Sequence, residues 1–133
     1  MWPFRSKKTP FVPTEKTDYP YGLFIVTEAG YFLVREGGRL KTESHRVVSS
    51  WNSVVVLSSE SAVAHLPVTG ELGFRDGTLI KNKADKKEYL ISRGLKRQIV
   101  SPDVYEKYGL NESYTIKVSD SETNFHKDGE VLS

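Results

Sequence analysis

An internal repeat constrains this chain more than any other feature of its sequence. The segments 22–25 (GLFI), 32–34 (FLV) and 70–72 (GEL) return as 77–80 (GTLI), 89–91 (YLI) and 129–131 (GEV). The offset grows from about 55 to about 59 residues, which corresponds to small insertions between the two copies. A recurrence on this scale marks a supersecondary unit that is used more than once. The sequence therefore predicts two similar tandem units.

Strand patterns dominate each copy. Apolar runs at 22–26 and 31–34 are separated by a turn at 28–30, and a second turn follows at 36–38. The glycines of both turns are typical of hairpins. Val54 and Val56 alternate with their neighbours, as Tyr114, Ile116 and Val118 do in the second copy. The segments 54–60 (VVVLSSE) and 61–68 (SAVAHLPV) are likewise interpreted as mainly strand.

One short helix is predicted in each copy. The run from Ser44 to Trp51 places Val47, Val48 and Trp51 on one helical face, although β-branched residues make it a poor isolated helix.

The second helix is predicted over residues 102–108, with Ser101 as N-cap, Pro102 at the first helical position and Gly109 as the stop. We expect Val104, Tyr105 and Tyr108 to pack against the sheet of the same unit. The turn 93–96 (RGLK) is aligned with 37–40 (GGRL).

These patterns predict an α+β fold that is mainly β. We expect an extended N-terminal arm over residues 1–21, a first β-β-short helix-β unit over 22–75 and a second over 76–133. A chain of 133 residues holds one compact core or two small ones that support each other. One compact domain built from both units is the expectation.

The arm differs in composition from the rest of the chain. Four prolines stand close together, which disfavours helix and favours an extended, polyproline-like segment outside the main sheet. Aromatic and basic side chains lie between them, and disordered segments are usually poor in aromatics. Two interpretations stay open: a disordered tail, or an arm that binds a partner through Trp2, Phe4, Arg5, Lys7, Lys8, Phe11 and Tyr19.

Composition limits the class of protein. Apolar residues make up 38% of the chain, and their longest runs fall far short of a membrane span. Cysteine is absent, which removes disulfides and thiolate chemistry. The start (MWPFRSKK) has an apolar-then-basic order, opposite to that of a secretory signal, so we expect it to be retained.

No constellation in the sequence predicts catalysis. His45, His65 and His126 lack the spacing of a local metal site, and no G-x-S-x-G motif occurs. Pairs of acidic residues lie in turn-like segments, and Gly70, Gly73 and Gly77 do not form a phosphate-binding loop. We expect no catalytic residues, no metal site and no cofactor.

Basic clusters are the remaining candidates for a site. The net charge is only +2, a mild surplus for a nucleic-acid-binding protein. The lysines of 81–87 occupy one hairpin loop, and Arg93, Lys96 and Arg97 lie at the next turn, where they form a possible basic contact. Acidic neighbours and the lack of interleaved aromatics favour solvated loops over nucleic-acid binding.

Part of the second copy carries a resemblance. Asp76-Gly-Thr-Leu-Ile80 is followed by 89–91 (YLI), Gly94, 96–97 (KR) and a Ser101 helix start that ends at Gly109. This pattern over residues 76–110 resembles a small module of tailed-phage virion structural proteins and bacterial cell-surface proteins. The resemblance implies a non-catalytic β-rich module. Leu95 departs from the pattern, and the first copy follows it only through the repeat.

Three functions are weighed on these grounds. The first is a structural protein of a tailed-phage virion, present in many copies, bound to other virion proteins through the arm and assembled in the host bacterial cytoplasm. The second is a cell-wall or glycan-binding module, which predicts an exposed stacking face made by Trp51, Tyr31 or Tyr105. The third is a small enzyme, which requires a pocket that holds His45 or His65 beside Ser and Asp.

Overall fold

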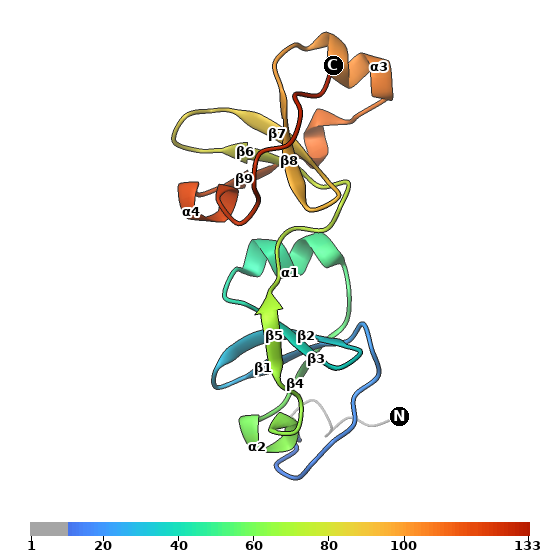
Figure 1. Ribbon diagram of the computed structural model, residues 1–133, viewed down its shortest axis with the longest axis vertical. Coiled ribbons are helices and arrows are strands. Elements are labelled where there is room, and N and C mark those ends of the chain that lie inside the picture. The colour runs from blue at the N-terminus through green and yellow to red at the C-terminus, as the bar shows by residue number, and fades with distance from the viewer. Residues whose placement is uncertain (1–10) are drawn as a thin grey trace, which may run out of the picture. The chain divides into compact units, whose positions relative to one another are not determined.

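The computed structural model describes residues 11–133, and the chain forms two compact units (Figure 1). Of the described residues, unit 1 contains 11–43 and 53–71, and unit 2 contains 44–52 and 72–133. The sequence led us to expect one compact domain divided at residue 75. The structure instead places residues 44–52 and 72–75 with the second unit.

Unit 1 is built on a five-stranded sheet. Its elements are β1 (Phe24–Thr27), β2 (Gly30–Arg35), β3 (Gly38–Thr42), β4 (Val55–Leu57), the short helix α2 (Glu60–Val63) and β5 (Val68–Glu71). The strand order is β4-β1-β2-β3-β5. The three-stranded meander β1-β2-β3 is antiparallel, and the two outer strands join it in parallel.

Unit 2 follows the same plan. Its sheet has the order β8-β7-β6-β9, and the C-terminal segment adds isolated parallel bridges to β8 at Lys96↔Asp128 and Ile99↔Leu132. Its elements are α1 (His45–Trp51), β6 (Leu79–Asn82), β7 (Glu88–Ser92), β8 (Leu95–Ile99), α3 (Asp103–Tyr108), the 3-10 turn η2 (Glu112–Tyr114), β9 (Ile116–Val118) and α4 (Asp120–Thr123).

The two units share their topology. In each, a meander of three strands takes a parallel strand on its first strand, and a later segment of the chain lies parallel to its third strand. Local contacts repeat as well: Thr27 and Asn82 each accept a hydrogen bond from the amide two residues later, and each contacts the acidic residue that opens the following short helix. The predicted fold class, mainly β with short helices, is confirmed.

Some details differ from the sequence expectation. Each meander has a third strand, β3 or β8, where only a turn was identified. Segment 61–68, expected to be mainly strand, contains the end of α2 and reaches β5 only at Val68. The turn alignment shifts by one residue, because Gly94 corresponds to Gly37 and both adopt positive φ.

Short turns connect the three antiparallel strands of each meander. Two-residue loops join β1 to β2 and β2 to β3, since Thr27 pairs with Gly30 and Arg35 pairs with Gly38. The loop between β7 and β8 has positive φ at both central residues, 55° at Arg93 and 73° at Gly94. Two positive φ values match the right-handed twist of antiparallel strands.

Both predicted helices form. The Ser44 hydroxyl caps α1 by accepting a hydrogen bond from the Val47 amide, and Val47 and Val48 are buried. Helix α3 begins at Asp103, one residue later than predicted, so Pro102 is its N-cap and the prediction of Ser101 as N-cap was wrong. The Ser101 hydroxyl still accepts from the Asp103 amide at 3.3 Å.

Helix α3 ends as predicted, at Gly109, which has a left-handed φ of 66°. Val104 and Tyr105 are buried, but Tyr108 does not pack as expected. Its side chain is about half exposed because its hydroxyl reaches the C-terminal residue and donates to the carbonyl oxygen of Ser133.

Two four-residue helices occupy equivalent places. Ser59 caps α2 through the Ala62 amide, and Ser119 caps α4 through the Glu122 amide. In α4 the Glu122 carboxylate also accepts from the Ser119 amide, which completes a capping box. These helices are too short for a hydrophobic period, so their caps are the main local signal.

Each unit has its own apolar cluster. In unit 1, the buried residues Ile25, Phe32, Val34 and Val63 pack together. In unit 2, α3 covers the sheet and the cluster consists of Leu79, Ile99, Val104, Tyr105 and Leu132. Burial raises the pKa of Tyr105 to about 12, and the nearby Glu88 adds to the effect. Within residues 11–133, no helix is long and apolar enough to cross a membrane.

Candidate functional site

The base of the N-terminal arm is bound to unit 1. The carbonyl oxygen of Pro13 accepts from the Ser59 hydroxyl, and the Thr17 amide donates to the Ala62 carbonyl at 3.0 Å. The Tyr19 hydroxyl donates to Ser58 at 2.8 Å, and its ring packs against the apolar cluster of unit 1. Residues 13–19 are therefore part of unit 1, held by the segment that carries β4 and α2.

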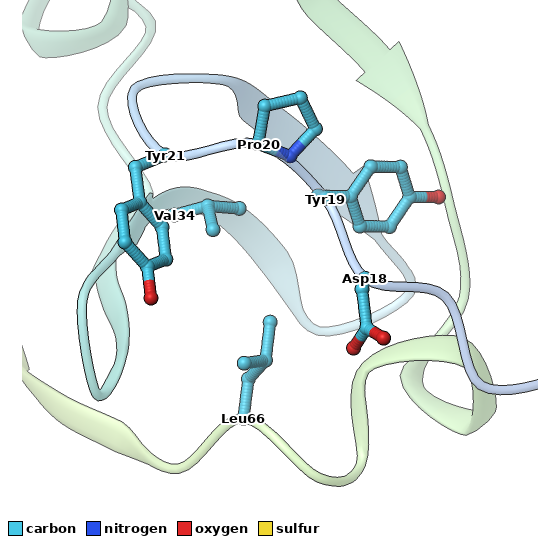
Figure 2. Close-up of a pocket in the computed structure, with 6 residues that line it drawn as sticks. All are labelled: Asp18, Tyr19, Pro20, Tyr21, Val34 and Leu66. Carbon is cyan, nitrogen blue, oxygen red and sulfur yellow. The ribbon is translucent and has the colours of Figure 1, made fainter.

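A hollow of about 400 Å³ opens where this base meets the sheet (Figure 2). In Figure 2 the Tyr21 ring and the Asp18 carboxylate stand on either side of it, while Leu66 points into the space between them. The Tyr19 hydroxyl points away. The lining consists of Asp18, Tyr19, Pro20, Tyr21, Val34 and Leu66.

This hollow combines apolar walls with a polar rim. Tyr21 is 67% exposed, and the Asp18 carboxylate lies 3.1 Å from Nε2 of His65, whose side chain is 25% exposed. An exposed aromatic ring beside a carboxylate can stack on a flat group and accept a hydrogen bond from it. The site is therefore suited to holding a ring-shaped or extended ligand at the surface of unit 1.

Unit 2 has a hollow of similar volume, about 400 Å³, at a different place in the repeat. It lies where the start of β6 meets the segment after α3, and its most exposed aromatic residue is Tyr114. Its lining consists of Ser50, Gly77, Thr78, Leu79, Gly109, Leu110, Asn111, Tyr114 and Ile116. The two hollows are not equivalent, so the repeat does not provide two copies of one ligand site.

A buried cation lies at an equivalent position in each sheet. In unit 1, the Arg39 guanidinium lies 4.2 Å from the centre of the Phe32 ring. Its Nη atoms donate to both carboxylate oxygens of Glu60, at 2.7 and 2.9 Å, and its Nε donates to the Leu66 carbonyl. The hydrogen bond from Arg39 lowers the pKa of Glu60 below its ordinary value, and partial burial opposes this effect.

In unit 2, Lys96 takes the place of Arg39. Its Nζ lies 5.7 Å from the centre of the Tyr89 ring and donates to the carbonyls of His126, at 3.0 Å, and Thr123, at 3.4 Å. The carboxylate of Asp128 is 3.6 Å away and exposed. Burial, with smaller contributions from nearby aspartates, raises the pKa of Tyr89.

His126 is a buried structural residue. Its Nε2 accepts from the Phe74 amide at 2.9 Å, and its Nδ1 lies 2.7 Å from the Gly94 carbonyl oxygen. Because an amide only donates and a carbonyl only accepts, the ring must carry its proton on Nδ1. A Cβ on Gly73 would lie 2.5 Å from the ring, so glycine is required beside it.

A second structural carboxylate belongs to Glu122. It accepts from the Ser44 hydroxyl at 2.6 Å and from Arg46 at 3.1 Å. Burial alone would raise the pKa of Glu122, but these contacts and those to Ser119 lower it below its ordinary value. Glu122 therefore joins α1 to α4 within unit 2.

The arm residues expected to bind a partner fall into three groups. Trp2, Phe4, Arg5, Lys7 and Lys8 lie outside the described residues. Phe11 is 84% exposed. Tyr19, in contrast, packs within its own unit.

The three basic candidates do not form one surface. Lys96 is buried, with its amine bound to carbonyls inside unit 2. Arg97, its neighbour on β8, points to the opposite face of the sheet and donates to the Glu130 carbonyl. Arg93 occupies the exposed turn before them. In residues 11–133, no three His, Asp or Glu side chains are grouped to hold a metal ion.

Sequence reasoning missed Tyr21 and Asp18 at the hollow, and it missed Arg39 and Glu60. The signal for Arg39 was present, since aligning Gly37 with Gly94 places Arg39 opposite Lys96. Tyr21 and Asp18 gave no such signal, because their meeting with Leu66 depends on the path of the arm. Comparison of the chain with protein-family models, with curated protein sequences and with solved structures gives no match.

Proposed function

We propose that the protein is a non-enzymatic structural component of a tailed-bacteriophage virion that associates with other virion proteins through its N-terminal arm. The fixed base of the arm carries the proposal. Pro13, Thr17 and Tyr19 are bound to unit 1, and Phe11, just before them, is 84% exposed. Aromatic and basic residues of the chain are therefore joined to a fixed anchor, a suitable arrangement for binding a neighbour in a repetitive shell.

The resemblance of residues 76–110 to virion modules supports the same proposal. So does the use of polar side chains: those of Arg39, Glu60, Lys96, His126 and Glu122 all bind groups within their own unit. These side chains stabilise the units themselves, so binding of a partner would fall to other, exposed residues. Association through an arm requires no catalytic constellation.

The test removes residues 1–12 and leaves the Pro13 contact in place. Each aromatic side chain buried on a partner contributes about 1.5–3 kcal/mol before the cost of ordering the arm. We expect an unchanged thermal unfolding midpoint and loss of the truncated protein from purified virions, measured by mass spectrometry. Absence of the full-length protein from virions, or normal incorporation of the truncated one, would contradict the proposal.

A glycan-binding function is the second candidate, favoured by the hollow beside Tyr21. The residues first expected to form a stacking face do not do so, since Tyr105 is buried and Trp51 and Tyr31 are half-buried. Tyr21 and Asp18 offer such a face instead. Pull-down with bacterial cell walls would test it: Tyr21→Ala should abolish retention, and Tyr114→Ala, at an equally exposed ring of unit 2, should not.

A further inference from the structure

The outer edge of β4 differs from every other sheet edge that the structure describes. Val54, Val55 and Leu57 are 64%, 40% and 45% exposed, whereas Val56 points to the apolar cluster of unit 1. No charged residue occurs in the sequence 51–59 (WNSVVVLSS), although 27% of the chain is charged. Edge strands of soluble proteins are normally protected by charges, prolines, bulges or covering segments.

The other three edges carry such protection. Strand β5 follows Pro67, and its pairing with β3 contains a register shift at Arg39. The edge of β8 is bridged by the C-terminal segment. Strand β9 holds the exposed Lys117 at the position equivalent to Leu57, because Val56 pairs with Ile25 as Ile116 pairs with Ile80.

The backbone of β4 presents a self-complementary pattern. The Val54 carbonyl accepts from Phe24, and the Ser58 amide donates to Val26, so the even-numbered residues bond to β1. Residues alternate along a strand, and the N–H and C=O groups of Val55 and Leu57 therefore point away from β1. Two donors and two acceptors line this edge, spaced as an antiparallel copy of the same edge requires.

We propose that two copies of this chain associate through β4, paired edge to edge and antiparallel about a two-fold axis. Val56 lies opposite Val56 of the second copy. Val55 and Leu57 then exchange hydrogen bonds with Leu57 and Val55 of that copy, which satisfies all four free groups on each strand and joins the two sheets into one. A two-fold interface uses the same patch on both partners, and this patch carries no charge to repel its copy.

None of the residues of this edge lines the hollow beside Tyr21. The inference goes beyond the virion assignment and does not depend on it. A short edge pairing is a weak contact, with a Kd of about 1 µM to 1 mM. In a symmetric assembly such contacts add to those made by the arm.

Analytical ultracentrifugation of the full chain over concentrations up to about 1 mM measures the association. We expect a monomer–dimer equilibrium that Leu57→Lys weakens at least tenfold, because it copies the protective lysine of β9. Val68→Lys, at an exposed valine on the opposite edge of the same sheet, is the matched control and should leave the dimer intact. Circular dichroism confirms that both variants are folded.

A cross-link tests the register. The chain has no cysteine, so Val56→Cys introduces a single thiol that faces its own copy across the axis. Opposed residues of this kind have Cα atoms about 4.5 Å apart, within reach of a disulfide. We expect rapid formation of a disulfide dimer by Val56→Cys and slow formation by Val68→Cys. A monomer at every concentration, or a dimer that Leu57→Lys does not weaken, would overturn the proposal while leaving the arm's role in virions untouched.

Discussion

Arg39 in unit 1 and Lys96 in unit 2 occupy equivalent strand positions, and each lies over an aromatic ring, but their partners differ. Arg39 meets both oxygens of the Glu60 carboxylate, whereas Lys96 donates to the carbonyls of His126 and Thr123. Both bond to the carbonyl at the same place, Leu66 in unit 1 and His126 in unit 2.

The difference shows which part of the arrangement the fold requires. The common elements are a cation on the third strand, an aromatic ring against which it packs and a backbone carbonyl in the segment just after the short helix. The counter-ion is replaceable. Arginine uses its planar fork to bind a carboxylate in two places, whereas the lysine ammonium can be satisfied by carbonyl dipoles.

Removal of the counter-ion should therefore affect the two units very differently. Glu60→Ala leaves the buried Arg39 without its carboxylate and should lower the free energy of unfolding by about 2–3 kcal/mol, less than for a fully buried pair because Glu60 is partly exposed. Asp128→Ala removes an exposed carboxylate and should cost less than about 1 kcal/mol. Urea denaturation measures the free energy of unfolding of both variants. Equal costs would contradict the predicted difference between Glu60 and Asp128 as counter-ions.

A pair of residues near the buried cation also differs between the units. Unit 2 has Gly73 and His126 there, and unit 1 has Asp18 and Leu66 at the equivalent positions. His126→Leu leaves the Phe74 amide without its acceptor and should cost about 1–3 kcal/mol. Gly73→Asp places a Cβ against the imidazole and should also destabilise.

The double variant Gly73→Asp/His126→Leu gives unit 2 the Asp–Leu pair of unit 1. Because leucine removes the ring that the aspartate would strike, we expect the two costs to fall short of additivity by about 1 kcal/mol or more. A double-mutant cycle in urea measures this coupling. Simple additivity would mean that the two positions are not a matched pair.

Helix caps give a smaller contrast. Ser59 and Ser119 each accept from an amide three residues later, and replacing either by alanine should cost about 1 kcal/mol. Ser101 makes one longer bond, to Asp103, so its replacement should cost about 0.5 kcal/mol. Thermal unfolding midpoints of the three variants rank the three serines, and a larger loss for Ser101→Ala would contradict this order.

Acid should act on both units through one carboxylate each. The pKa values of Glu60 and Glu122 are lowered below 4.5 in the folded protein, so the unfolded chain takes up protons first as the pH falls. Stability gained from both carboxylates is present above about pH 4.5 and is lost as the pH falls through the folded pKa values. Glu60→Gln and Glu122→Gln should each flatten the acid limb of a stability–pH curve, and Glu71→Gln is an exposed control.

Sequence patterns identified most strands and the two longer helices, because alternation, turn glycines and capping serines are local signals. Gly94, Ser44 and Gly109 each act within a few residues of their own position. The short helices α2 and α4 escaped, although Ser-x-Ser recurs at 59–61 and 119–121, because apolar residues around α2 suggested a strand.

The candidate site was less accessible to prediction. The contact between Tyr21, Asp18 and Leu66 depends on how the arm turns back to the sheet, and no short pattern encodes that path. The role of Lys96 was missed because a lysine in a turn-like segment is usually solvated. The β4 edge, in contrast, is visible in sequence as an uncharged run once its pairing with β1 is known.

The assignment of α1 to unit 2 has a consequence for synthesis. The chain passes from unit 1 into unit 2 at residue 44, returns at 53 and leaves again at 72. On the ribosome, α1 emerges long before Glu122, which receives a hydrogen bond from the α1 cap Ser44. Ser44 therefore gains this partner only after Glu122 has been translated, whereas every member of the apolar cluster of unit 1 precedes residue 67. We expect the sheet of unit 1 to form first and α1 to reach its final contacts only when α4 is in place.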